Sequence, residues 1–104
     1  MIDWDRVREL RAEVGEDAFD EVVELFLDEV DESVESLTPG CDVPATLHFV
    51  KGSAANLGFN EFCAACAEAE QTPADQVDLA AIRATYHDSR TVFLSGLNNL
   101  QAAA

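Results

Sequence analysis

The sequence predicts an all-α fold: an antiparallel four-helix bundle with a short additional helix at its N-terminus. In five segments the apolar residues recur every three or four positions, the spacing of one face of an amphipathic helix. Short stretches separate these segments, and none of them alternates apolar and polar residues as a strand does. Because short loops between long helices place neighbours antiparallel, we expect a bundle. The 104 residues suit one domain, spanning residues 1–104, with a single core.

The first two helices are expected at residues 3–14 and 16–37. Asp3 can cap the first helix, and Gly15 breaks the pattern between the two. Glu16 and Asp17 suit the start of the second helix, because carboxylates are favoured at the positive end of the helix dipole. The apolar stripes consist of Trp4, Val7, Leu10 and Val14 in the first helix and of Phe19, Val22, Val23, Phe26, Val30, Val34 and Leu37 in the second. Carboxylates cover the opposite side of the second helix, so we expect only one of its faces to be buried.

The third helix is expected to follow a loop at residues 38–41 and to end at Gly58. Asp42 can cap it, and Pro44 fits its first turn, where a missing N–H is harmless. A glycine at the end of such a pattern is typical of a helix C-terminus. The buried stripe of this helix is expected to contain Leu47, Val50, Ala54 and Leu57.

A fourth helix at residues 59–70 and a fifth at residues 77–100 complete the predicted bundle, with a turn at residues 71–75 between them. Gly96 is expected to weaken the last turn of the fifth helix, because glycine is a poor helix former. The residues expected to face inward are Phe59, Phe62, Cys63, Cys66 and Ala69 in the fourth helix and Leu79, Ile82, Tyr86, Phe93, Leu97 and Leu100 in the fifth.

The chain is strongly acidic, with 21 Asp and Glu against 6 Lys and Arg and a formal net charge of −15. Such a surface repels nucleic acid and anionic membranes, so we expect neither as a partner. It favours partners with basic or apolar docking faces, and like-charge repulsion leads us to expect a monomer. The carboxylates follow the solvent faces of the predicted helices, and no pair among them stands out as an acid–base site.

Cysteine usage and the first residues indicate a cytoplasmic protein. Acidic residues such as Asp3 and Asp5 interrupt any signal-peptide pattern, and no apolar run reaches the roughly 20 residues of a membrane span. Three cysteines, an odd number, favour reduced thiols. Cys63 and Cys66 have the spacing of half a zinc or redox site, but no second Cys/His pair completes it. We interpret them as small buried apolar residues and expect no metal.

The stretch from Leu47 to Gly58 carries the candidate chemistry. At about 100° per residue, His48 points away from the buried stripe, and Lys51 and Gly52 follow one turn later. Lys51 places a positive charge one turn along the helix from the imidazole. Glycine inside a helix costs about 1 kcal/mol relative to alanine, so Gly52 is best explained by a partner that must approach the imidazole closely. The pattern indicates a reactive histidine on an open helix face.

These residues resemble the signature of the histidine-containing phosphotransfer (HPt) domains of multistep two-component signalling. The family motif reads His-x-x-Lys-Gly-[Ser/Ala]-[Ala/Ser]-x-x-[Leu/Phe]-Gly, and it is matched without a gap by His48, Lys51, Gly52, Ser53, Ala54, Leu57 and Gly58. Cys66 and Glu70 match a Cys and a Glu often found on the family's next helix, and Phe26 matches a Phe usual in the preceding acidic helix. The likeness covers nearly the whole chain.

The resemblance implies that His48 accepts a phosphoryl group from the phospho-aspartate of a receiver domain and passes it to another receiver. Lys51 would stabilise that phosphoryl group, and Gly52 would allow the close approach. The implied partners are response-regulator receiver domains, a hybrid histidine kinase, or both. The resemblance implies no cofactor in this chain and Mg²⁺ on the partner receiver. The protein would then be a phosphocarrier rather than an enzyme.

Three further residues near His48 are candidates for partner docking. Phe49 lies about 100° around the helix from His48 and is suited to an apolar docking rim. Asn56, about 80° away, could bind a phosphate or partner, or equally be solvated. Ala55 lies on the same face as His48, two turns along. His87 is the only other histidine and lacks a matching Lys or Gly, so we interpret it as a surface residue.

Two other classes of function compete with phosphotransfer. The first is an HPt-fold docking module that binds and inhibits a kinase or receiver without carrying phosphate; docking alone would not require the His48 imidazole. The second is a hydrolase with His48 as general base, which lacks a nucleophile within clear reach and a recognisable oxyanion site. Phosphotransfer therefore ranks first, docking second and hydrolysis last.

Overall fold

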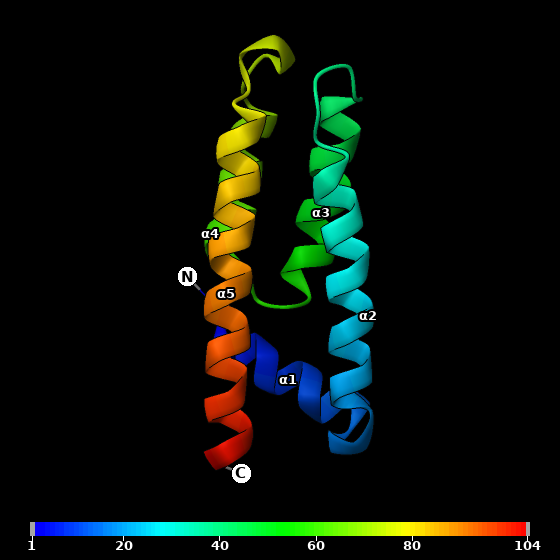
Figure 1. Ribbon diagram of the computed structural model, residues 1–104, viewed down its shortest axis with the longest axis vertical. Helices are drawn as coiled ribbons and strands as arrows, with labels where there is room; N and C mark the ends of the chain where they lie inside the picture. Colours follow the sequence, from blue (N-terminus) through cyan, green and yellow to red (C-terminus); the bar gives the residue numbers. More distant parts are fainter. Residues whose placement is uncertain (1, 104) are drawn as a thin grey trace.

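Five α-helices build the structure, a computed structural model that describes residues 2–103, with side chains described up to residue 99 (Figure 1). Along the chain the elements are α1 (Trp4–Val14), α2 (Glu16–Glu35), α3 (Val43–Ala55), α4 (Asn60–Glu70), the 3₁₀ helix η1 (Ala74–Gln76) and α5 (Leu79–Ala103). No strand occurs among the described residues. The predicted all-α class is confirmed.

The helices form an elongated bundle that measures 46 × 20 × 17 Å along its principal axes. α2 and α5 run along its length at the front of Figure 1, and the shorter α3 and α4 lie behind them in the upper half. Around the bundle, α2 packs on α3, α3 on α4, and α4 on α5, while α5 packs less closely on α2. α1 crosses one end of the bundle, the lower end in this view.

The predicted apolar stripes meet in one core. An aromatic cluster lies at its centre, where the Phe59 ring centroid is 5.9 Å from that of Tyr86 and 5.3 Å from that of Phe93. Leu27 is also buried, although the predicted stripe of α2 omitted it. Leu100 lies outside the described side chains. Some residues predicted to lie in the core are only partly buried and pack against its outside: Trp4, Val14, Val22, Phe26, Cys63 and Leu79.

α1 is held across the lower end by its first residue, Trp4. The indole ring stacks on Phe93 of α5, with ring centroids 5.9 Å apart and planes 5° from parallel. A Cβ added to Gly96 would overlap this indole, so the glycine is needed for the close approach of α1 to α5. α5 continues past Gly96 to Ala103, so the role of this residue is the contact with Trp4 rather than a weakened last turn.

The end of α3 confirms the predicted role of Gly58. Gly58 has a φ of +74°, its N–H donates to the carbonyl of Ala55 (3.1 Å), and the N–H of Phe59 donates to that of Ala54 (3.3 Å). This pair of bonds is the Schellman motif, which favours glycine at the left-handed position. The carbonyl of Gly58 also accepts a hydrogen bond from the N–H of Asp3 (2.7 Å), so the same turn connects α3 to the start of α1.

Several predicted helix ends differ from the structure: α3 ends at Ala55 rather than at Gly58, α4 begins at Asn60 rather than at residue 59, and α5 extends to Ala103 rather than to residue 100. The changes at the end of α2 and the start of α5 have a clear cause. α2 ends at Glu35 rather than at residue 37, because the N–H of Leu37 donates to the carbonyl three residues back, that of Val34 (3.1 Å). α5 begins at Leu79 rather than at residue 77, because the Asp78 carboxylate accepts the N–H of Ala81 (3.0 Å) and so caps the helix.

Candidate functional site

α3 presents His48 on its solvent-exposed side. The Asp42 carboxylate caps the helix by accepting the N–H of Ala45 (3.2 Å). Leu47 and Val50 are buried in the core, and this fixes the rotation of the helix about its axis. His48 is exposed as a result, in the orientation that the helical spacing predicts.

Gly52 leaves the surface beside His48 open. The residue is exposed, and a Cβ added to it would meet no heavy atom within 4 Å beyond its chain neighbours and the nearby helix backbone. Neither a contact with another helix nor a left-handed backbone therefore requires glycine here. Alanine at this position would favour the helix by about 1 kcal/mol. The glycine leaves open space one turn of helix away from His48.

Lys51 forms an ion pair with Glu70 of α4. Its Nζ lies 2.9 Å from Oε1 and 3.0 Å from Oε2 of the carboxylate, and it donates a hydrogen bond to Oε2. The side chains of Lys51 and Glu70 are 31% and 23% exposed, so the pair lies at the edge of the solvent. Lys51 thus shares its positive charge with Glu70, a carboxylate whose role the sequence alone does not indicate.

A second contact joins α4 to the backbone of Lys51. The Cys63 thiol donates to the Lys51 carbonyl (Sγ–O 3.5 Å). Burial raises the pKa of Cys63, against the opposing effect of the Lys51 charge, and burial above all raises the pKa of Cys66 to about 12. Both thiols therefore keep their protons at neutral pH. Cys66 is fully buried, as predicted, whereas Cys63 is only partly buried and helps to hold α3 against α4.

The candidate docking residues differ in exposure. Phe49 is 48% exposed, Ala55 is exposed and Asn56 is intermediate. The structure adds Leu25, which is 63% exposed on α2, the helix that packs on α3. The signal for Leu25 in the sequence is a leucine off the apolar stripe, directly after Glu24. Neighbouring helices thus each present a large exposed apolar side chain.

The structure confirms that His87 is a surface residue. It is exposed on α5, and its ring packs edge-on against that of Tyr86, with centroids 5.5 Å apart. It offers a natural comparison for His48, because it is exposed but lacks the Lys and Gly neighbours.

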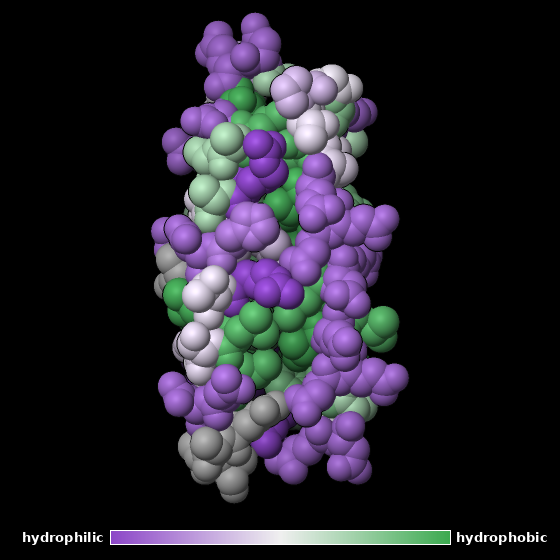
Figure 2. Space-filling model, in the orientation of Figure 1, coloured by the Kyte–Doolittle hydropathy of each residue, from purple (hydrophilic) through white to green (hydrophobic). Residues whose placement is uncertain are grey.

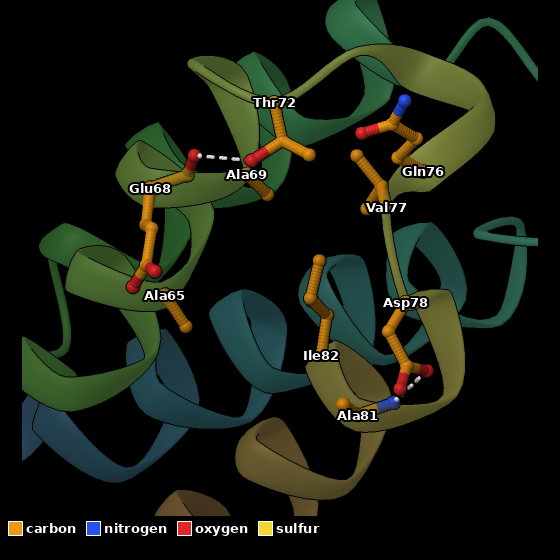
Figure 3. Close-up of a pocket in the computed structure, with 9 residues that line it drawn as sticks. All are labelled: Ala65, Glu68, Ala69, Thr72, Gln76, Val77, Asp78, Ala81 and Ile82. Atoms are coloured by element: carbon orange, nitrogen blue, oxygen red, sulfur yellow. Dashed lines mark hydrogen bonds between the residues drawn. The ribbon is translucent and has the colours of Figure 1, made fainter.

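A hollow of about 240 Å³ lies elsewhere, between the end of α4, η1 and the start of α5 (Figure 3). Two of its polar side chains form hydrogen bonds with nearby backbone groups: the Thr72 hydroxyl donates to the carbonyl of Glu68 (3.1 Å), and Asp78 caps α5. None of the predicted site residues lines it.

No three His, Cys, Asp or Glu side chains among residues 2–103 form a group that could hold a metal ion. In the same range, no helix has the length and apolar character that crossing a bilayer requires.

Comparison with known proteins identifies one family. The family model described as the Hpt domain matches residues 21–103, from the first turns of α2 to the end of α5. No curated protein and no solved structure shows a significant match to the chain. α1 lies before the matched range, and the His48 helix lies within it.

Proposed function

This chain belongs to the Hpt domain family, whose members are phosphotransfer modules of phosphorelays, and we propose that His48 accepts a phosphoryl group from the phospho-aspartate of one receiver domain and passes it to another. The observation that carries the proposal is an exposed imidazole beside a helical glycine that the fold does not require. The family's usual partners, receiver domains and histidine kinases, supply the donor and the acceptor.

The transfer is a nucleophilic displacement at phosphorus. One imidazole nitrogen of His48 forms the N–P bond while the bond from phosphorus to the aspartyl oxygen breaks, and the aspartate leaves as a carboxylate. Attack by a second receiver's aspartate reverses this step and regenerates the imidazole. Phosphoryl transfer depends on in-line placement and on neutralisation of the phosphoryl charge. The receiver's own Lys and Mg²⁺ supply most of the positive charge for this neutralisation. The chain is therefore a phosphocarrier rather than an autonomous catalyst.

Lys51 is the residue of this chain that is suited to the transferred charge. In the unmodified protein, the Lys51 ammonium is bound to Glu70, whose carboxylate oxygens lie within 3.0 Å of Nζ. A phosphoryl group on His48 would therefore share the Lys51 ammonium with Glu70. Glu70 therefore lowers the positive charge that the phosphoryl group meets, and it also holds the flexible Lys51 side chain against α4. This balance favours an intermediate that is passed on rather than stored.

The receiver docks over the open side of α3. Gly52 admits its active site to His48, while Phe49, with Leu25 on the neighbouring helix, offers apolar contact area. Ala55 and Asn56 extend this area by two turns along α3. We place the reaction in the cytoplasm, because the three free cysteines suit a reducing compartment.

The decisive experiment measures transfer of a radiolabelled phosphoryl group from a panel of phosphorylated receiver domains to three proteins: wild type, His48→Gln and His87→Gln. We expect label on the wild type and on His87→Gln, and none on His48→Gln. The label should be acid-labile and base-stable, as a phosphohistidine is. The two variants are matched, because each removes one exposed imidazole from a helix.

Two outcomes would overturn the proposal. Label that persists on His48→Gln would place the phosphoryl group on another residue. Tight binding to a receiver or kinase with no label on the wild type, unchanged by His48→Gln, would instead show a docking module that inhibits its partner.

A further inference from the structure

A groove separates α2 from α5 on the face away from α3 and α4. It has a volume of about 340 Å³ and lies between the first half of α2 and the second half of α5, in the lower half of the molecule (Figure 1). Nearer the upper half, the two helices are connected by Asp31 of α2, which accepts hydrogen bonds from the hydroxyl of Tyr86 and from Nε of Arg90 (3.1 Å). Over their whole length, α2 and α5 pack less closely than the other neighbouring helices of the bundle do.

The floor of the groove is apolar. Val23 and Leu27 of α2 and Leu97 of α5 are exposed by 8% or less, while Leu94 is 36% exposed at its edge. Figure 2 shows this apolar surface in the lower half of the molecule, bordered by hydrophilic side chains. The exposed part of Leu94 remains available for further burial.

One wall of the groove is acidic. Asp20, Glu24 and Asp28 follow each other at four-residue intervals along α2, so they form a ridge with a spacing of about 6 Å. Glu24 and Asp28 are exposed and form no ion pair among the described residues. Arg90 is the cation among the described residues that line the groove, and its charge is already paired with Asp31. The wall therefore retains a negative charge beside an apolar floor.

We propose that this groove binds a basic amphipathic helix of a partner protein. An apolar stripe on that helix would cover Leu94 and the floor, in the helix-in-groove mode of recognition. Lys or Arg residues four apart along one flank of the partner would face Asp20, Glu24 and Asp28 with matching spacing. A second copy of this chain is a poor occupant, because it carries the same net charge of −15.

This second binding face is separate from the phosphotransfer site. His48 and Gly52 lie on α3, whereas the described residues that line the groove belong to α2 and α5. A partner bound there leaves the open side of α3 free, so it can hold the protein beside a kinase or receiver while His48 reacts. The proposal does not depend on phosphotransfer by His48.

The test uses the full chain and a fluorescent synthetic peptide of about 18 residues, long enough to be helical. The peptide has one leucine stripe and, along one flank, Lys residues four positions apart; in a control peptide Glu replaces each Lys. Fluorescence anisotropy should give a micromolar Kd for the Lys peptide and little binding of the Glu peptide. We expect Glu24→Lys and Leu94→Asn each to weaken binding about tenfold, as loss of a charge or an apolar contact of 1.4 kcal/mol does.

Matched variants separate the groove from general attraction. Glu61→Lys makes the same charge change on α4, and Leu25→Asn removes an exposed leucine outside the groove; both should leave the Kd unchanged, as should His48→Gln. The proposal would be overturned if the Lys peptide did not bind or if the Glu peptide bound equally well. It would also be overturned if Glu61→Lys and Leu25→Asn weakened binding of the Lys peptide as much as Glu24→Lys and Leu94→Asn do. A dimer in sedimentation that Leu94→Asn dissociates would overturn it too, because a second copy would then be the occupant.

Discussion

Gly52 and Gly58 lie six residues apart in the same motif, yet they serve different purposes. Gly58 has a left-handed backbone, and a Cβ on it would lie 2.5 Å from the carbonyl oxygen of Asp3, so the fold requires glycine there. Gly52 has a helical backbone and open space around it, so the fold does not. A residue that lowers helix stability without a structural need is best explained by what binds beside it.

Substitution of the two glycines should therefore separate stability from transfer. We expect Gly52→Ala to raise the free energy of unfolding by about 0.5–1 kcal/mol, because alanine is the better helix former. Gly52→Gln should fold normally but reduce the rate of transfer from a phospho-receiver by about 10- to 100-fold, because its side chain displaces the partner. Urea unfolding and transfer kinetics measure the two effects.

Gly58→Ala is the matched control. We expect it to lower the free energy of unfolding by about 1–3 kcal/mol, because the left-handed backbone at this position would be strained. A normal transfer rate in Gly52→Gln would contradict the assigned role of Gly52.

The Lys51–Glu70 pair makes a second prediction at the scale of residues. Glu70→Gln removes the carboxylate that competes for Lys51 and repels a phosphoryl group. We expect this to shift the transfer equilibrium toward phosphorylated His48 by about three- to fivefold, the size of a partly exposed ion-pair effect. Lys51→Gln should shift it in the opposite direction. The phosphorylated fraction at equilibrium with a receiver, followed by ³¹P NMR, gives both values.

Glu68→Gln is the control, since Glu68 lies two residues away on α4 and lines the hollow near α5 instead. If Glu70→Gln reduced phosphorylation as strongly as Lys51→Gln does, Glu70 would be needed to position Lys51 rather than to compete for it.

At the scale of elements, α1 is a helix that lies wholly outside the match to the family model, which begins at Glu21. It closes the lower end of the bundle, where α3 and α4 are absent (Figure 1). Two contacts hold its start: the Asp3 N–H bonded to Gly58, and the Trp4 indole stacked on Phe93 beside Gly96. The first joins α1 to the end of the His48 helix, so α1 supports that helix as well as the core.

Gly96→Ala should displace α1. The added methyl group overlaps the Trp4 indole, and overpacking of this kind costs about 1–3 kcal/mol. Because the chain has one tryptophan, we expect a red-shifted emission maximum together with a lower urea midpoint. Gly52→Ala, the same substitution in a helix with open space, should stabilise the protein and leave the emission unchanged. An unchanged spectrum in Gly96→Ala would contradict the packing of Trp4 on α5.

At the scale of the whole molecule, charge is the dominant property. A formal net charge of −15 on 104 residues repels other copies, and we propose that the protein is a monomer for this reason. The same repulsion acts within the chain and opposes the compact state. The observed ion pairs offset only part of it, because the cations are few and several pairs, such as that of Arg8 with Asp5, lie exposed on α1.

Added salt should therefore stabilise the fold. Raising the ionic strength from about 0.01 M to about 0.15 M shortens the Debye length from about 30 Å to about 8 Å, which screens most repulsion between distant carboxylates. We expect the Tm, followed by circular dichroism in NaCl, to rise over this range. A falling Tm would show that the exposed ion pairs outweigh the net repulsion. Sedimentation at the same salt concentrations tests whether the protein is a monomer.

The sequence by itself determined the helices, their buried sides and the exposure of His48. These depend on local rules: apolar spacing sets the buried face, Asp3 and Asp42 cap their own helices, and Gly58 ends one. The ends of α2 and α5 were predicted less well, since they depend on a tightened turn and on the Asp78 cap, which apolar spacing does not report.

Only the tertiary structure decided which side chains meet across helices. Lys51 meets Glu70, Trp4 meets Gly96, and the groove forms beside Leu94, each between residues far apart in the chain. Such contacts depend on the crossing angle of two helices and on their offset along the axis. The apolar pattern of one helix specifies which side is buried but not these quantities, so they appear only once the helices are packed together.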